Sequence, residues 1–414
     1  MASIKLKHTG GNGVIIAAPT SNPASDKTLT LPSDVDGTVV SKDSSNSLQN
    51  IAGINGGQLG NRNLWINGAC LVNQRGSSST SEGYQTIDRF YVGSGGTDEA
   101  QTQAQVDVAS GTTPYTLGFR KALRITNGNQ TSGAGSGDFM YLKYTFEAQD
   151  IANSGWNYLS SSSYVTLSFW VKSSVAQSFK AYFHTRQGTE YQYPFETGSL
   201  SADTWTKVTK TISGNSNLTF NSDNGLGLEL YIWSFIGTDY TASSVTEDAW
   251  STYNSSARMK DATSTWYTTN DATLEFTGFQ FEVGSTETDF EHRLFGQELA
   301  LCQRYYYRWT ASAADDYVGM CQAYASSAIF GVIRQLPVTM RATPTGSASG
   351  TFKGVNSSGS TGNTGSFTST NLNVMNKNSI GINGWTGASG LSGGNAVVVI
   401  ETTGSGYIDA SAEL

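Results

Sequence analysis

The chain has 414 residues, of which only 14% are charged, and it carries a formal net charge of −8. This acidic balance argues against nucleic acid and anionic membrane surfaces as partners, because both are bound through clustered Lys and Arg. No run approaches the ~18 apolar residues of a transmembrane helix, and 46 glycines with abundant Ser, Thr and Asn favour an all-β protein with many turns.

Residues 1–60 show short strand patterns separated by turns, at Ser3–His8, Gly13–Ala18, Thr28–Leu31 and Gly37–Ser41. Each strand contains few apolar residues, and a segment of this size rarely buries enough surface to fold by itself. We therefore expect residues 1–60 to be ordered only against other chains.

Residues 61–290 have the strongest strand patterns. In Tyr164–Lys172, alternate apolar residues share one face. Similar runs occur at Ala122–Thr126, Phe139–Phe146, Ser178–His184, Trp205–Ile212, Leu226–Phe235 and Thr273–Val283. Seven or more strands joined by Gly, Ser and Asn turns predict a two-sheet sandwich. We expect Gly93–Thr113 to be an exposed loop, and Trp170 and Trp205 to lie in the core.

An insertion at residues 238–272 interrupts the strand pattern and contains five aromatic residues. Loops of this length are usually functional or disordered, and rings of Trp and Tyr can pack on the apolar faces of sugars. The candidate ligand-binding residues, in or beside loops, are Tyr191, Tyr193, Trp250, Tyr253, Trp266 and Tyr267. The alternative is that these rings anchor loops or contact another subunit.

Residues 291–309 are predicted to form a helical connector, followed by a C-terminal β domain at 310–414. The candidate oligomerisation residues, spaced as the a and d positions of two heptads, are Phe295, Leu299, Cys302, Tyr306 and Trp309. Two arrangements are open: a helix packed on its own sandwich, or a three-helix seam on a trimer axis.

The sequence contains no recognisable catalytic motif. Its three histidines lie far from any Ser or Cys motif, and no phosphate loop or zinc-protease pattern is present. Glu190 and Glu196 flank an aromatic stretch and could form a glycosidase pair, but a chain with 33 acidic residues offers many such pairs. The three widely spaced cysteines are expected to be buried apolar residues. We expect no enzyme activity and no cofactor; a structural Ca²⁺ would suit such a sandwich, although no acidic loop motif marks it.

Two pairs of segments resemble a known module. Asn63–Gly76 with Tyr84–Tyr91, and Phe279–Arg293 with Glu298–Tyr307, resemble the opening and closing signatures of a module found in bacteriophage tail-fibre and receptor-binding proteins, including fibres of the marine cyanophage type. This resemblance implies a carbohydrate-binding-like jelly roll between the signatures. Residues 1–60, around Thr28–Ser33, resemble the attachment regions of such fibres.

The resemblance implies a virion protein, assembled in the host cytoplasm and carried on the tail or capsid as a fibre. The weak apolar content of residues 1–60 and the possible heptad seam predict a homotrimer, and the lack of a catalytic motif predicts that it is non-catalytic. Residues 1–60 would contact other virion proteins, and the outer domains would bind a host cell-surface polysaccharide or protein. Two alternatives stay open: a decorating fibre without a specific receptor, and a polysaccharide-degrading tailspike.

Overall fold

The computed structural model describes residues 3–7, 13–17, 61–356, 365–367, 372–387 and 390–414. The chain divides into two units, 1–52 and 53–414. In the first unit, β1 (Ser3–Lys7) and β2 (Gly13–Ala17) pair as an antiparallel hairpin, as the strand pattern predicts. The predicted strands at Thr28–Leu31 and Gly37–Ser41 lie outside the described residues.

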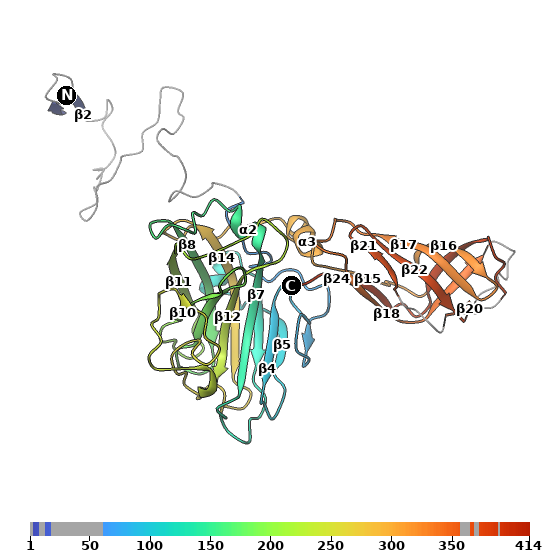
Figure 1. Cartoon of the computed structure of the whole chain (residues 1–414), viewed down its shortest axis with the longest axis horizontal. Coiled ribbons are helices and arrows are strands. Elements are labelled where there is room, and N and C mark those ends of the chain that lie inside the picture. The colour runs from blue at the N-terminus through green and yellow to red at the C-terminus, as the bar shows by residue number, and fades with distance from the viewer. Residues whose placement is uncertain (1–2, 8–12, 18–60, 357–364, 368–371, 388–389) are drawn as a thin grey trace. The chain divides into compact units, whose positions relative to one another are not determined.

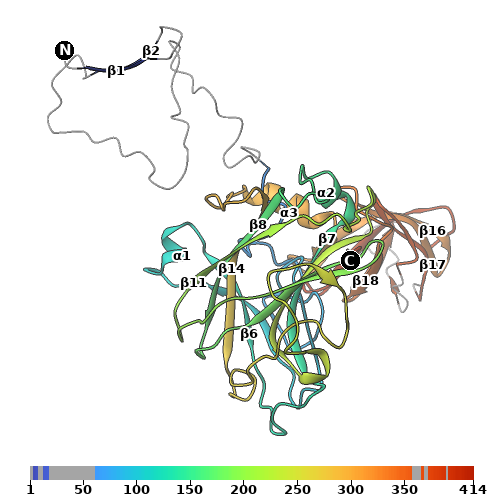
Figure 2. The ribbon, with the colours of Figure 1, turned by 60° about the vertical axis from the view of Figure 1, so that its left-hand side comes forward.

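The second unit begins with a sandwich of two antiparallel six-stranded sheets (Figures 1 and 2). Sheet A contains, in spatial order, β13 (Ser251–Thr252), β10 (Tyr191–Glu196), β9 (Lys180–Thr185), β12 (Leu226–Ile236), β7 (Phe139–Glu147) and β4 (Tyr91–Gly95). Sheet B contains β11 (Thr206–Ser213), β8 (Tyr164–Ser173), β14 (Thr273–Val283), β6 (Lys121–Thr126), β5 (Thr102–Asp107) and β3 (Ser78–Ser79). The chain crosses repeatedly between the sheets, which gives the predicted all-β jelly-roll sandwich.

The prediction of a loop throughout Gly93–Thr113 is wrong, because the end of β4 and all of β5 lie within it. The glycines there allow close packing rather than flexibility. A Cβ on Gly93 would lie 2.6 Å from the ring of Tyr141, and one on Gly95 would lie 2.5 Å from the ring of Phe139. Glycine in a strand often marks such a close approach.

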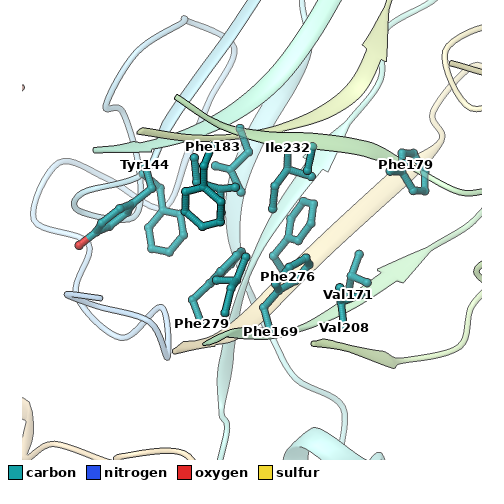
Figure 3. Packing of buried hydrophobic residues seen from close by; sticks show 14 of the residues in the cluster. Tyr144, Phe169, Val171, Phe179, Phe183, Val208, Ile232, Phe276 and Phe279 are labelled. Atoms are coloured by element: carbon teal, nitrogen blue, oxygen red, sulfur yellow. The ribbon is translucent and has the colours of Figure 1, made fainter. Parts of the chain in front are cut away.

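The core of the sandwich is filled with aromatic rings from both sheets. Phe169, Phe276 and Phe279 from sheet B face Phe183 and Ile232 from sheet A, as Figure 3 shows. The period-two pattern of β8 is confirmed, since its alternate apolar residues all join this core.

Trp170 and Trp205, predicted to lie in this core, instead lie outside it. They are half-buried and pack against a smaller cluster that includes Phe119. Trp170 alternates with the core residues of β8, so its side chain emerges on the opposite face of sheet B.

The opening and closing signatures contact one another directly. The Asn63 amide donates to the carbonyl of Phe279, and the Asn67 backbone N–H donates to Glu298. The ring of Trp65 stacks on Phe279 at 4.4 Å, and Arg293 donates to the carbonyls of Asn63 and Trp65. The two signatures therefore close the sandwich, which gives both of them a structural role.

The helical connector is shorter than predicted. Helix α3 (Phe295–Gln303) ends before β15 (Tyr306–Thr310), so Tyr306 and Trp309 belong to a strand and not to a heptad seam. Within the helix, Cys302 is buried among residues of the same chain, whereas Phe295 is 57% exposed. The other helical turns of the sandwich are α1 (Thr113–Thr116), α2 (Ala148–Ala152) and a 3-10 turn at Thr238–Tyr240.

The C-terminal domain is also a β-sandwich. Its small sheet contains β15, β24 (Tyr407–Ser411) and β18 (Thr345–Ser349). Its large sheet contains β20 (Gly365–Ser366), β19 (Phe352–Asn356), β23 (Ala396–Glu401), β16 (Asp316–Ala325), β17 (Ala328–Gln335), β22 (Ser379–Thr386) and β21 (Val374–Asn376). Ile408 from the small sheet and Val397 from the large sheet share one core.

The last residues of the chain return to the first sandwich. Glu413 forms ion pairs with Arg89 and, at 3.2 Å, with Arg75, and all three side chains are nearly inaccessible. The Tyr84 hydroxyl donates to the carbonyl of Leu414 at 2.8 Å. The C-terminus is therefore part of the packing between the domains.

The three cysteines are free and buried, as expected. Burial raises the pKa of Cys70 and of Cys321 to about 12, so both thiols stay protonated.

Candidate functional site: an aromatic cleft on sheet A

The face of sheet A that points away from the core carries a second set of aromatic residues. On β7, Phe139 and Tyr141 alternate with the core residues Met140 and Leu142. The same alternation on β12 and β9 places Tyr231, Trp233, Tyr182 and His184 on this face. These six residues line a cleft of about 370 Å³.

Strand register brings these rings into contact. Tyr231 lies opposite Tyr182 on the neighbouring strand, and their rings stack with centroids 5.0 Å apart and planes 7° apart. Trp233 lies opposite Tyr141, and their ring centroids are 5.0 Å apart. Such cross-strand aromatic pairs stabilise a sheet, so the floor of the cleft is preorganised.

The wall of the cleft comes from the long insertion. Tyr240, Tyr253 and Arg258 line the cleft, and Met259 is fully buried against the floor. The ring of Tyr253 stacks on His184 with centroids 4.0 Å apart. The insertion therefore packs down on sheet A and turns a flat sheet face into a cleft.

One end of the cleft contains a balanced network of charges. The buried Glu229 carboxylate lies 3.3 Å from the Lys143 ammonium and 3.5 Å from the Arg186 Nε, and it accepts a hydrogen bond from the Tyr231 hydroxyl at 3.3 Å. Glu190 pairs with Arg186 at 3.2 Å. Each carboxylate thus has a cationic partner.

His184 joins this network as a neutral group. Its Nε2 lies 3.0 Å from Glu190. Burial, together with the neighbouring Arg186 guanidinium, lowers the pKa of His184 below its usual value. The imidazole is therefore uncharged at neutral pH and can donate one hydrogen bond and accept another.

The other end of the cleft contains donors without acceptors. The guanidinium carbon of Arg258 lies 4.8 Å from the ring centroid of Tyr240 and 5.8 Å from that of Trp233. Within the described part of the chain, the Arg258 Nε and the Trp233 indole N–H are buried and have no hydrogen-bond acceptor. Trp233 is only 2% exposed. Such groups are costly to leave unpaired.

Of the six aromatic residues predicted from the sequence to bind a ligand, only Tyr253 lines this cleft. Tyr193, Trp266 and Tyr267 are buried in the core of the sandwich. Tyr191 and Trp250 are half-buried against that core, and the Trp250 indole donates to the carbonyl of Ser213 at 2.7 Å. Trp250, Trp266 and Tyr267 therefore match the loop-anchoring alternative, whereas Tyr191 and Tyr193 lie on strand β10.

Sequence reasoning missed the floor of the cleft. Phe139 and Tyr141 on β7, and Tyr231 and Trp233 on β12, are each separated by one residue, so the period-two pattern places each pair on one face. Both faces of these strands carry apolar or aromatic side chains, although only one face contacts the core of the sandwich. This two-sided pattern could have indicated a second aromatic surface.

Glu190 and Glu196, considered from the sequence as one possible carboxylate pair, lie at opposite ends of β10 and have different partners. Glu196 forms its ion pair with Lys180 at 2.9 Å, whereas Glu190 pairs with Arg186 and His184. Across the described residues, no group of three or more His, Cys, Asp or Glu side chains could hold a metal ion. No helix among them is long and apolar enough to span a membrane.

No protein-family model and no curated protein matches the sequence. Among solved structures, the chain is similar to the enzymatically active domain of tailspike protein 4 from bacteriophage CBA120, with 11% identity and a TM-score of 0.28 over 53% of this chain and 21% of the tailspike. It is similar to a family 11 carbohydrate-binding module from Clostridium thermocellum (9% identity, TM-score 0.25, 51% of this chain, 98% of the module). A xylan-binding domain from Paenibacillus barcinonensis gives 12% identity and a TM-score of 0.24 over 51% of this chain and 94% of the domain. These values are too low to assign a ligand.

Proposed function

We propose that this chain binds glycans in the aromatic cleft of sheet A. The observation that carries the proposal is the preorganised floor, in which half-buried Tyr141 and Tyr231 present ring surface inside a cavity. Sugar rings have apolar faces that pack on such aromatic surfaces, and their hydroxyl groups can pair with the polar groups at both ends. A concave site of this size, lined by aromatic rings together with convergent polar and charged groups, is typical of small-ligand binding.

Glycan-array binding by the full-length chain tests this proposal. Tyr231→Ala should abolish the signal for every glycan that the natural chain binds, because it removes the central ring of the floor. Tyr115→Ala is the matched control: Tyr115 is also half-buried and stacks against Arg120, but it does not line the cleft. Equal loss or equal retention of binding in the two variants would place the glycan site elsewhere.

The cleft favours binding over hydrolysis. Glu229 and Glu190 are each engaged by a cation at 3.2–3.5 Å. Both carboxylates are therefore already held in ion pairs, whereas glycosidase catalysis needs two carboxyl groups that flank the scissile bond. We propose that the bound glycan is released intact. Release of reducing ends from a bound polysaccharide would contradict this and favour the tailspike alternative.

We further propose that the chain is a homotrimeric phage fibre that presents this cleft to the host surface. The resemblance of the two signature segments to phage fibre modules supports this assignment. The outer face of the large C-terminal sheet supports self-association, because it exposes Tyr317 (71%), Met320 (67%) and Tyr324 (73%) on one strand. Large exposed apolar side chains gathered on one strand can mark a contact between proteins.

Sedimentation of the full-length chain tests this assignment. The expected mass is about three times the 44.1 kDa of one chain. Met320→Glu combined with Tyr324→Glu should lower the mass, whereas Leu159→Glu, at a 50% exposed position on the first sandwich, should not. A natural chain that stays monomeric at micromolar concentration would contradict the trimer.

A further inference from the structure

The charges around the cleft are not matched evenly. At the end formed by Glu229 and Glu190, each carboxylate has a cation within 3.5 Å. At the other end, Arg258 has no carboxylate within ion-pair distance among the described residues. Three acidic residues of the insertion are engaged elsewhere: Asp261 accepts a hydrogen bond from Thr241 at 2.5 Å, Glu247 pairs with Lys180 at 2.8 Å and Lys260 at 3.5 Å, and Asp248 pairs with Lys210 at 3.1 Å.

Arg258 is also held in place. Its backbone N–H donates to the carbonyl of Tyr240 at 2.9 Å, and its guanidinium lies over the rings of Tyr240 and Trp233. The neighbouring residue Met259 is fully buried, which anchors this part of the insertion. A guanidinium fixed in this way loses little side-chain entropy when it binds a ligand.

Two buried donors on residues that line this end of the cleft therefore have no acceptor: the Arg258 Nε and the Trp233 indole N–H. Buried donors are nearly always hydrogen-bonded in folded proteins. A ligand that supplies acceptor atoms and one negative charge would satisfy both donors and the unpaired cation together. A carboxylate has this chemistry, and its planar pair of oxygens matches the planar guanidinium.

We infer that the cleft recognises acidic glycans, with the carboxylate of a uronic or sialic acid residue held by Arg258 and the Trp233 indole. This inference rests on the proposed glycan-binding function and adds the ligand class. The sugar ring that carries the carboxylate lies on Tyr231 and Tyr141. Because the whole chain has a net charge of −8, long-range attraction does not supply the selectivity, which must come from these local contacts.

Calorimetric titration of the full-length chain with acid and ester forms of the same sugars tests this inference. The probes are a hyaluronan hexasaccharide, an oligogalacturonate and sialyllactose, each compared with its methyl ester. The ester keeps the ring and removes the charge. At least one acid should bind about tenfold or more tightly than its ester, as expected for hydrogen bonds to a charged group.

Two cleft variants assign the selectivity to residues. Arg258→Gln should bring the affinity for the acid down to that for the ester while leaving the ester unchanged. Trp233→Phe keeps an aromatic ring but removes the indole donor. It should lower the affinity for the acid and leave the affinity for the ester unchanged. Arg120→Gln is the matched control, because Arg120 also lies over a tyrosine ring but outside the cleft. Circular dichroism confirms the fold of each variant, and the comparison of acid with ester in the natural chain stands even if one variant does not fold.

The remaining outcomes separate this inference from the proposed function. If acid and ester bind equally and Tyr231→Ala removes both, the glycan cleft stands and acid recognition is wrong. If the preference for the acid survives in both Arg258→Gln and Trp233→Phe, the assignment to this end of the cleft is wrong. If none of these sugars binds, in acid or in ester form, acid recognition is overturned, whereas the proposed function is overturned only if the glycan array also gives no binding that depends on Tyr231.

Discussion

The replacement Trp266→Ala tests whether the aromatic residues of the insertion are structural. Trp266 is fully buried, packs near Phe179 and donates its indole N–H to the carbonyl of Thr273 at 3.0 Å. Truncation of a buried Trp to Ala lowers the free energy of unfolding by about 3–5 kcal/mol, because it leaves a cavity. For a domain of 150–250 residues, each kcal/mol shifts the melting temperature by about 2–4 °C. The expected decrease is therefore about 6–20 °C.

Differential scanning calorimetry measures this effect. Trp266→Phe should give a smaller decrease, because much of the buried ring remains while the hydrogen bond is lost. Trp250→Ala should also cost less than Trp266→Ala, since Trp250 is only half-buried. An unchanged melting temperature for Trp266→Ala would refute this reasoning and return the residue to the set of ligand contacts.

Three further changes test the packing at the signatures and the C-terminus. Gly68→Ala should lower the melting temperature, since the added Cβ would lie 2.0 Å from a backbone oxygen of β14, whereas Gly76→Ala meets nothing within 4 Å and should be neutral. Glu413→Gln should lower the free energy of unfolding, measured in urea, by about 3–5 kcal/mol, because it leaves buried Arg89 without its counter-charge. A decrease below about 1 kcal/mol would contradict this. Burial raises the pKa of Asp88 to about 6, so its folded form holds a proton that the unfolded form has lost, and stability should fall as pH rises from 4 to 6. Asp88→Asn should remove that part of the slope, and an unchanged slope would show that other groups cause it.

The strands of the sandwich could be predicted because their signal is local. In β14, alternating apolar residues mark Thr273–Val283 as a strand whatever it packs against, and the structure has the same limits. The end of helix α3 could not be predicted in this way, because a four-three spacing continues through Tyr306 and Trp309. Those residues pair with β24 instead, and this pairing depends on a strand about 100 residues further along the chain.

The cleft was harder to predict for a related reason. Periodicity shows which residues share a face, but it does not show which face is covered. On β12, Leu230 and Ile232 enter the core, whereas Tyr231 and Trp233 form the floor of the cleft. In the insertion, Trp266 enters the core and Tyr253 reaches the cleft, and this difference follows from tertiary packing that the spacing of aromatics does not encode.

A crystal structure of the full-length chain with a bound glycan, chosen as the tightest binder on the array, tests the central claim most directly. The account predicts a sugar ring stacked on Tyr231 between sheet A and the insertion, within hydrogen-bond distance of at least one of Arg258 and Trp233. A glycan bound on sheet B or on the C-terminal domain, with the cleft empty, would contradict it.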